Sequence, residues 1–152
     1  MDSLPQALRL KSIQAIKTFL ANKASNTPLD VPTILFVGGI PPSFVPTIIV
    51  LAEPLRADIT NQEELVAAKI ESFRQAGSNF KEIAHTDTTL GGREATLIEY
   101  QAILGGAARQ DVAAFFIADG VIWSVTCASA RQNFPQYKND LYLIARSLRV
   151  QS

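Results

Sequence analysis

Three short glycine-bearing links divide the second half of the sequence into four stretches with the composition of β-strands. The links are Gly91-Gly92, Gly105-Gly106 and Asp119-Gly120. Two-residue links of this kind need positive φ angles, which these residue types tolerate, and they join antiparallel strands. The sequence therefore predicts an antiparallel meander with a positive φ at Gly92, and its strands cover Phe80–Thr88, Glu94–Ile103, Asp111–Ala118 and Val121–Ala128.

Two further strands and a well-marked helix precede this meander. The stretches Thr33–Gly38 and Phe44–Leu55 are rich in β-branched residues, and a loop of glycine, proline and serine separates them. The helix follows in "TNQEELVAAKIESFRQAG". Thr60 with Glu63, or Asn61 with Glu64 in the neighbouring register, can form a capping box at its start.

The buried stripe and the end of this helix can also be predicted from the sequence. Two more helices are expected elsewhere in the chain. Gly77 would stop the helix, and its buried stripe is predicted to be Val66, Ile70 and Phe73. Gln6–Lys23 reads as an amphipathic helix, although "LPQALRL" fits a short edge strand equally well. The last helix starts near Pro135 and buries Tyr137, Leu141, Ile144 and Leu148.

The strand Val112–Ile117 fixes how these elements are layered. Neither alternate set of its side chains is polar, which is typical of a central strand covered on both faces. We therefore predict an α+β fold, an α/β/α sandwich with a central antiparallel sheet of about six strands flanked by helices. With 152 residues the chain fits a single domain, 1–152, in which 1–29 form an N-terminal helix or extension.

Charge and hydropathy argue against a nucleic-acid partner and against a membrane-spanning segment. Fourteen lysines and arginines balance fourteen aspartates and glutamates without a basic stripe, so nucleic acid is not an expected partner. The longest apolar run, "VPTIIVLA", is too short to span a bilayer, and no signal peptide is recognisable. The chain as given is expected to be soluble and cytoplasmic. A leader removed for the periplasm or thylakoid lumen would leave the same sequence.

Residues capable of catalysis are few. Gly91-Gly92 precedes a strand, whereas a phosphate-binding loop opens a helix, so we interpret this pair as a turn. Cys127 lies in an apolar run and is expected to be a buried small hydrophobe. His85 and Asp87 share a strand face, but no nucleophile or metal-ligand spacing accompanies them. We predict no enzyme activity, no metal and no cofactor; a hydrolase using this pair is the alternative.

One strand face combines polar and apolar side chains. Leu97, Glu99, Gln101 and Ile103 point to the same side of the strand Glu94–Ile103. The set can be a hydrated patch at the border of a layer. Alternatively, it forms a polar anchor in an apolar groove that binds a small ligand or the helix of a protein partner.

Five stretches of the chain together carry a resemblance to a known family: "FVPTIIVLAEPL", "QEELVAAKIESFRQ", "FKEI…TTLGGREATLIEYQ", "RQDVAAFFIADGVIWSVTCAS" and "FPQYKNDLYLIARSLRV". They resemble the PsbP-like superfamily of small α/β/α proteins, and in particular its uncharacterised bacterial DcrB-like branch. The most family-like run is Leu90–Ala95 followed by Tyr100. The resemblance covers most of the chain, but Met1–Asn26 lacks the Gly-Trp or similar pair that is common in the opening strand of such proteins.

The resemblance implies binding rather than catalysis. The superfamily includes photosystem II extrinsic subunits, a nuclear-transport factor and cytoplasmic chaperones of type VI secretion effectors. In the Eag-type chaperones, which the chain also resembles, strands hold a client's transmembrane helix. By that resemblance Glu99, Gln101 and Gln110 would replace the client's helix–helix hydrogen bonds. The expected partner is thus a protein, a hydrophobic peptide or a second copy of the chain, bound by Leu97, Glu99, Gln101, Ile103 and Gln110.

Overall fold

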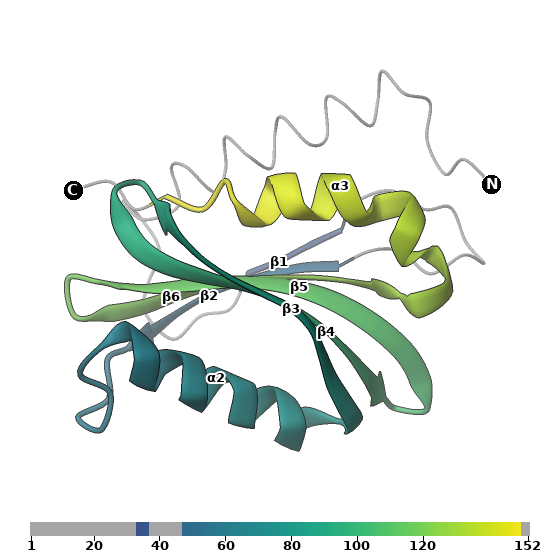
Figure 1. Cartoon of the computed structure of the whole chain (residues 1–152), viewed down its shortest axis with the longest axis horizontal. Coiled ribbons are helices and arrows are strands. Elements are labelled where there is room, and N and C mark those ends of the chain that lie inside the picture. Colours follow the sequence, from purple (N-terminus) through teal and green to yellow (C-terminus); the bar gives the residue numbers. More distant parts are fainter. Residues whose placement is uncertain (1–32, 37–46, 150–152) are drawn as a thin grey trace.

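The described chain forms one six-stranded antiparallel sheet with a helix on each face (Figure 1). The computed structural model describes residues 33–36 and 47–149, so the helix expected at Gln6–Lys23 lies outside the described residues. The strand order is β1-β2-β6-β5-β4-β3, and every pair is antiparallel. This confirms the predicted α+β class. The elements are β1 Thr33–Phe36, β2 Thr47–Pro54, α2 Gln62–Ala76, β3 Ser78–Leu90, β4 Arg93–Leu104, β5 Ala107–Ala118, β6 Val121–Ala130, the 3-10 turn η2 Arg131–Asn133 and α3 Phe134–Ala145.

The three glycine-bearing links are turns, as predicted. Gly92 has a φ of 80°, and in the last link Asp119 and Gly120 have φ values of 52° and 76°. Because each turn has only two residues, the paired strands extend right up to it. β3 therefore reaches Leu90 and β5 begins at Ala107, both beyond the predicted bounds.

Helix α2 begins in the second of the two predicted capping registers. Asn61 is the N-cap, and its side chain accepts a hydrogen bond from the Glu64 backbone amide at 2.8 Å. Glu64 Oε1 in turn accepts from the amide of Thr60 at 3.1 Å. These contacts satisfy backbone donors at the helix start that have no partner within the helix.

Of the expectations for the rest of α2, the stop at Gly77 is confirmed and the buried stripe is wrong in detail. Gly77 ends the helix in extended backbone, with φ −148°, and not in the left-handed conformation that many glycine caps adopt. A Cβ at this position would lie 2.6 Å from the carbonyl oxygen of Ile103, so glycine is needed for close approach to β4. The predicted stripe of Val66, Ile70 and Phe73 is only half-buried. The buried positions of α2 are Gln62 and Leu65, both near the start of the helix.

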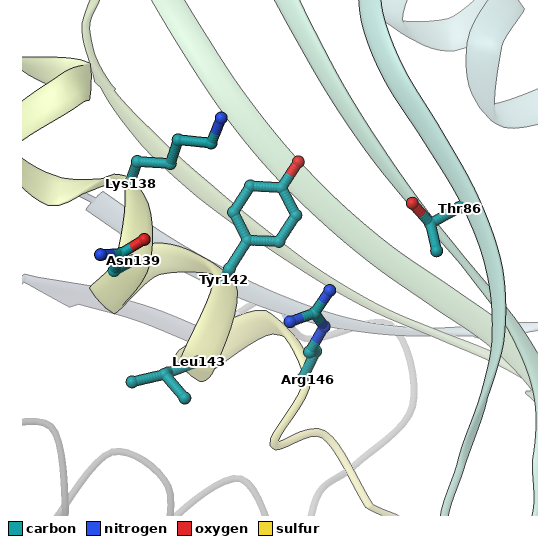
Figure 2. A pocket seen from close by; sticks show the side chains of 6 residues that line it. All are labelled: Thr86, Lys138, Asn139, Tyr142, Leu143 and Arg146. Carbon is teal, nitrogen blue, oxygen red and sulfur yellow. The ribbon is translucent and has the colours of Figure 1, made fainter.

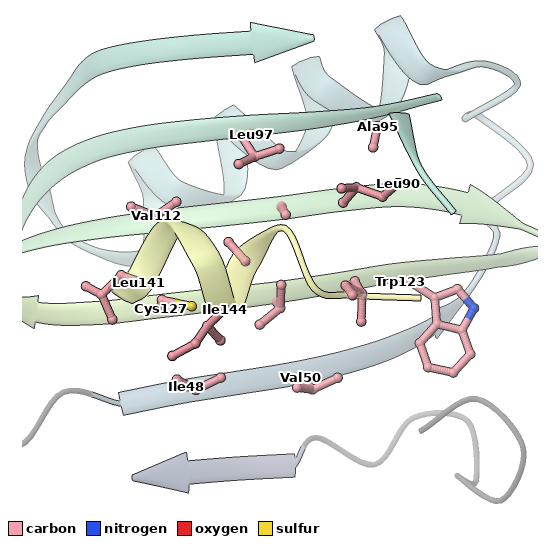
Figure 3. Close-up of a cluster of buried hydrophobic side chains, with 14 of the residues drawn as sticks. Ile48, Val50, Leu90, Ala95, Leu97, Val112, Trp123, Cys127, Leu141 and Ile144 are labelled. Atoms are coloured by element: carbon pink, nitrogen blue, oxygen red, sulfur yellow. The ribbon is translucent and has the colours of Figure 1, made fainter. Parts of the chain in front are cut away.

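The sheet separates two apolar cores. One lies between the sheet and α3 and contains Val112, Trp123 and Cys127 (Figure 3). Phe116 belongs to the same core. The other lies between the sheet and α2 and contains Phe115. Neighbouring residues of β5 thus enter different cores, which confirms the prediction of a central strand covered on both faces.

Helix α3 follows the predicted pattern. Pro135 lies in its first turn, where the missing amide is not needed. Tyr137, Leu141 and Ile144 are buried, as is Leu148 just beyond the helix end. Neither α2 nor α3 is long and apolar enough to cross a membrane, and no other helix in the described part of the chain is.

Candidate functional site

The five residues expected to bind a partner lie together on the α3 side of β4 and β5, but most of them are covered. Leu97 and Glu99 are only 2% and 3% exposed, and Gln110 is buried as well. Gln101 and Ile103 are half-buried. The expectation of an open groove is therefore wrong at Leu97, Glu99 and Gln110, because side chains from α3 close over this part of the sheet. Partner binding by the remaining surface stays a prediction.

A chain of hydrogen bonds surrounds the buried carboxylate of Glu99. The Tyr142 hydroxyl donates to Glu99 Oε1 at 2.7 Å, and Gln110 Nε2 donates to Oε2 at 2.6 Å. Gln101 Nε2 donates to Gln110 Oε1 at 3.1 Å, and Lys138 Nζ lies 3.9 Å from Glu99 Oε1. A buried charge is tolerated when it is paired and hydrogen-bonded in this way. We call these five residues the Glu99 network; it fastens α3 to the sheet.

The hydroxyl of Tyr142 is fixed in its protonated form by this arrangement. Burial raises its pKa, and the hydrogen bond to Glu99 and the charge of that carboxylate raise it further. A protonated hydroxyl can donate to Glu99 throughout the physiological range. Tyr142 and Lys138 could not be assigned to this site from the sequence, because their contact with Glu99 depends on where α3 lies on the sheet.

A groove lies between α3 and the edge strand β3, beside the Glu99 network (Figure 2). Its volume is about 530 Å³. Lys138, Tyr142 and Arg146 are spaced four residues apart, and the Arg146 guanidinium lies 5.3 Å from the centre of the Tyr142 ring. The stacking holds the Arg146 guanidinium at the groove, and the Lys138 side chain lines it as well. We call it the α3–β3 groove; its lining residues are Thr86, Lys138, Asn139, Tyr142, Leu143 and Arg146.

A second, smaller pocket lies on the opposite face, between α2 and β3. It has a volume of about 320 Å³, and we call it the α2–β3 pocket. The predicted pair meets here, with His85 Nε2 3.1 Å from Asp87 Oδ1. Both side chains reach solvent, and the lining contains neither serine nor cysteine. The lining residues are Gln62, Glu63, Val66, His85, Asp87, Glu94 and Thr96.

The hydroxyl of Thr96 lines the α2–β3 pocket and donates to Asp87 Oδ1 at 3.4 Å. The thiol of Cys127 is buried, and burial raises its pKa, so it is not poised as a nucleophile. Gln62 uses its side-chain amide to donate to Thr96 Oγ1 and to the Phe115 carbonyl, both at 3.1 Å. The described residues include no group of three or more histidine, cysteine, aspartate or glutamate side chains that could hold a metal ion.

A third polar site, which was not predicted from the sequence, is buried on the α2 side. The Tyr100 hydroxyl donates to Asp111 Oδ2 at 3.0 Å, and the Tyr100 ring stacks on Phe73 with centroids 4.5 Å apart. Burial raises the pKa of Asp111 to about 6, while the charge of Arg109 and the Tyr100 hydrogen bond oppose the shift. The sequence feature that could have predicted this pair is the two-residue turn Gly105-Gly106, because it fixes a register in which Tyr100 lies opposite Asp111.

These observations define an α+β sandwich whose buried polar groups serve packing and whose surface offers two pockets beside one edge strand. Comparison with solved structures confirms the PsbP-like fold that the resemblance implied. No protein-family model matches the chain. No curated protein matches it either.

Three solved structures illustrate the likeness. A protein of unknown function from Pseudomonas aeruginosa, PA94, shares 15% identity with a TM-score of 0.70, covering 84% of this chain and 88% of that one. CyanoP, the PsbP of the cyanobacterium Synechocystis, shares 15% identity with a TM-score of 0.56 over 80% and 83%. LpqN of Mycobacterium tuberculosis, involved in cell envelope biogenesis, shares 15% identity with a TM-score of 0.56 over 79% of each chain.

Proposed function

We propose that the chain is a non-enzymatic binding protein that contacts a protein partner with the α3 side of its sheet. The observation that supports this most is that the five residues expected to bind a partner differ in how far they are buried. Glu99 and Gln110 are used internally, whereas Gln101 and Ile103 stay half-buried where the network reaches the surface. A partly exposed isoleucine beside an amide can supply both apolar contact and orientation.

The choice of a binding role over an enzymatic one rests on the α2–β3 pocket. A His-Asp pair acts in hydrolysis by activating a nucleophile within hydrogen-bond reach. Here His85 contacts the acidic side chains of Asp87 and Glu82, at 3.1 and 3.8 Å, and the hydroxyl that lines the pocket belongs to the buried Thr96 and donates to Asp87 Oδ1 at 3.4 Å. Replacing His85 with alanine should therefore leave partner binding and biological activity intact.

The test is affinity capture from the native organism, with the eluates compared by mass spectrometry. Ile103→Asp places a carboxylate in the proposed apolar contact and should abolish recovery of the partner. Ile83→Asp is the matched control, since Ile83 is an exposed isoleucine on the edge strand. Both variants must first show a wild-type circular dichroism spectrum. Equal recovery by Ile103→Asp and wild type, repeated with purified partner, would contradict the proposed surface.

A more specific candidate is a chaperone that holds the transmembrane segment of a type VI secretion effector. The side-by-side amides of Gln101 and Gln110 next to Ile103 favour it, because an apolar helix loses its helix–helix hydrogen bonds outside the membrane. An effector gene next to the gene of this chain, and a stable complex when the two are co-expressed, would support this candidate. If the complex survives Gln101→Leu together with Ile103→Asp, the client binds elsewhere.

A further inference from the structure

The edge strand β3 presents a regular stretch of backbone to its surroundings. It is the last strand of the sheet, and no strand among residues 33–36 and 47–149 pairs with its outer edge. Its pairing with β4 is irregular between Ser78 and Lys81 and between Glu82 and Ala84, then regular from Ala84 to Leu90. Bulges, prolines and charged side chains, above all lysine, are the usual protection of an edge against strand addition. The half from Ala84 to Leu90 has no bulge, lysine or proline, and its one carboxylate, Asp87, lines the α2–β3 pocket.

The two surface pockets flank this regular half at the same point, one on each face. Thr86 lines the α3–β3 groove, while its neighbours His85 and Asp87 line the α2–β3 pocket. Successive side chains of a strand point to opposite faces. A strand laid along the outer edge of β3 would therefore direct alternate side chains into the two pockets.

The pockets differ in charge. On the α3 side, Lys138 and Arg146 stand at the groove next to Leu143, which is 49% exposed. On the α2 side the charged lining is acidic apart from the histidine, and comprises Glu63, Asp87 and Glu94. An extended segment that fits both pockets would carry an acidic side chain and, directly next to it, a basic one.

We propose that Ala84–Leu90 accepts an extended segment of a partner protein as a seventh strand. Main-chain hydrogen bonds to the edge supply affinity, and an adjacent acidic and basic residue fix the register. The acidic side chain faces Lys138 and Arg146, and the basic one faces Asp87 and Glu94. This contact is separate from the surface at Gln101 and Ile103, so either can fail without the other.

The probe is a synthetic peptide of threonine and valine with a central Glu-Lys pair, blocked at both ends. It is titrated into the full chain at low salt, and NMR follows amide hydrogen exchange. We expect slower exchange at alternate amides between Ala84 and Leu90, because alternate backbone groups of an edge strand point outward. A proline in place of one central valine should abolish this protection, since it removes a main-chain donor.

Charge reversal tests the orientation. Arg146→Glu should lower the affinity of the chain for the Glu-Lys peptide by about tenfold or more. The same variant should bind a Lys-Lys peptide with the affinity that was lost. Arg56→Glu is the matched control, since Arg56 is also exposed but lies just beyond β2, on the other side of the sheet order from β3. It should leave the affinity unchanged.

Three outcomes would overturn the proposal. Protection outside Ala84–Leu90 would place the peptide elsewhere, and equal effects of Arg146→Glu and Arg56→Glu would reduce the interaction to net charge. A dimer of the chain alone in analytical ultracentrifugation, with β3 amides already protected, would make a second copy the occupant in place of a partner segment.

Discussion

The buried carboxylate of Asp111 should make the chain less stable at neutral pH than in mild acid. Burial raises its pKa from 3.8 to about 6, despite the charge of Arg109 and the hydrogen bond from Tyr100. In the unfolded chain the carboxyl group returns to its ordinary pKa. Between these two values the folded state binds more protons than the unfolded state, so the free energy of unfolding falls as pH rises. The loss is complete above the folded pKa.

The size of this effect follows from the shift. One pKa unit corresponds to about 1.4 kcal/mol, so Asp111 lowers the free energy of unfolding by at most about 3 kcal/mol between mild acid and neutral pH. Asp111→Asn keeps the shape and an acceptor for the Tyr100 hydroxyl but cannot ionise. The free energy of unfolding of this variant should therefore not fall in this way as pH rises. Urea unfolding at several pH values, followed by the fluorescence of Trp123, the only tryptophan, measures the difference.

Other carboxylates also contribute to the pH dependence of the free energy of unfolding. The contribution of Asp111 is therefore obtained by comparing variants. Asp58→Asn is the matched control, because the Asp58 side chain is 71% exposed and pairs only with an exposed Arg56 at 3.3 Å. This variant should follow the wild type at every pH. If wild type and Asp111→Asn show the same pH dependence, the reasoning from burial is refuted.

Three further substitutions test individual contacts. Gly92→Val should cost about 1–3 kcal/mol through backbone strain alone, because an added Cβ meets nothing within 4 Å; an unchanged melting temperature would count against it. Gly77→Ala tests crowding instead, since its extended backbone suits any residue but the Cβ would lie 2.6 Å from the Ile103 carbonyl oxygen. We expect a loss of about 1–3 kcal/mol in chemical unfolding. Tyr142→Phe removes a donor to buried Glu99 and should cost about 1–3 kcal/mol, with a smaller cost in a Glu99→Gln background.

The strands and turns could be predicted because their signals are local. Asp119-Gly120 needs only its own two residues to specify a turn, and the alternation of β4 correctly places Leu97, Glu99 and Gln101 on one face. Gly77 shows the limit of local reasoning. Its position after a helix suggests a left-handed cap, whereas the need for glycine comes from a distant β-strand.

Which face stays open could not be predicted, since alternation says which residues share a face but not what covers it. Glu99 became buried because Tyr142, far along the chain, folds over it. The cross-strand pairs were accessible in principle. A two-residue turn at Gly105-Gly106 fixes the whole register of β4 against β5, and hence brings Tyr100 to Asp111 and Gln101 to Gln110.

The two helices cover different parts of the sheet, and this difference explains why the candidate binding features gather at β3. Helix α3 packs mainly on β5 and β6, whereas α2 packs on β3, β4 and β5. On the α3 side the sheet therefore continues past the helix, and Tyr142 and Lys138 bridge only as far as Glu99 on β4. Beyond them lie the exposed Thr86 and the groove. A partner segment that approaches this side meets the backbone edge and the two cations near Thr86, whereas the half-buried Ile103 lies further along β4, opposite Ser78.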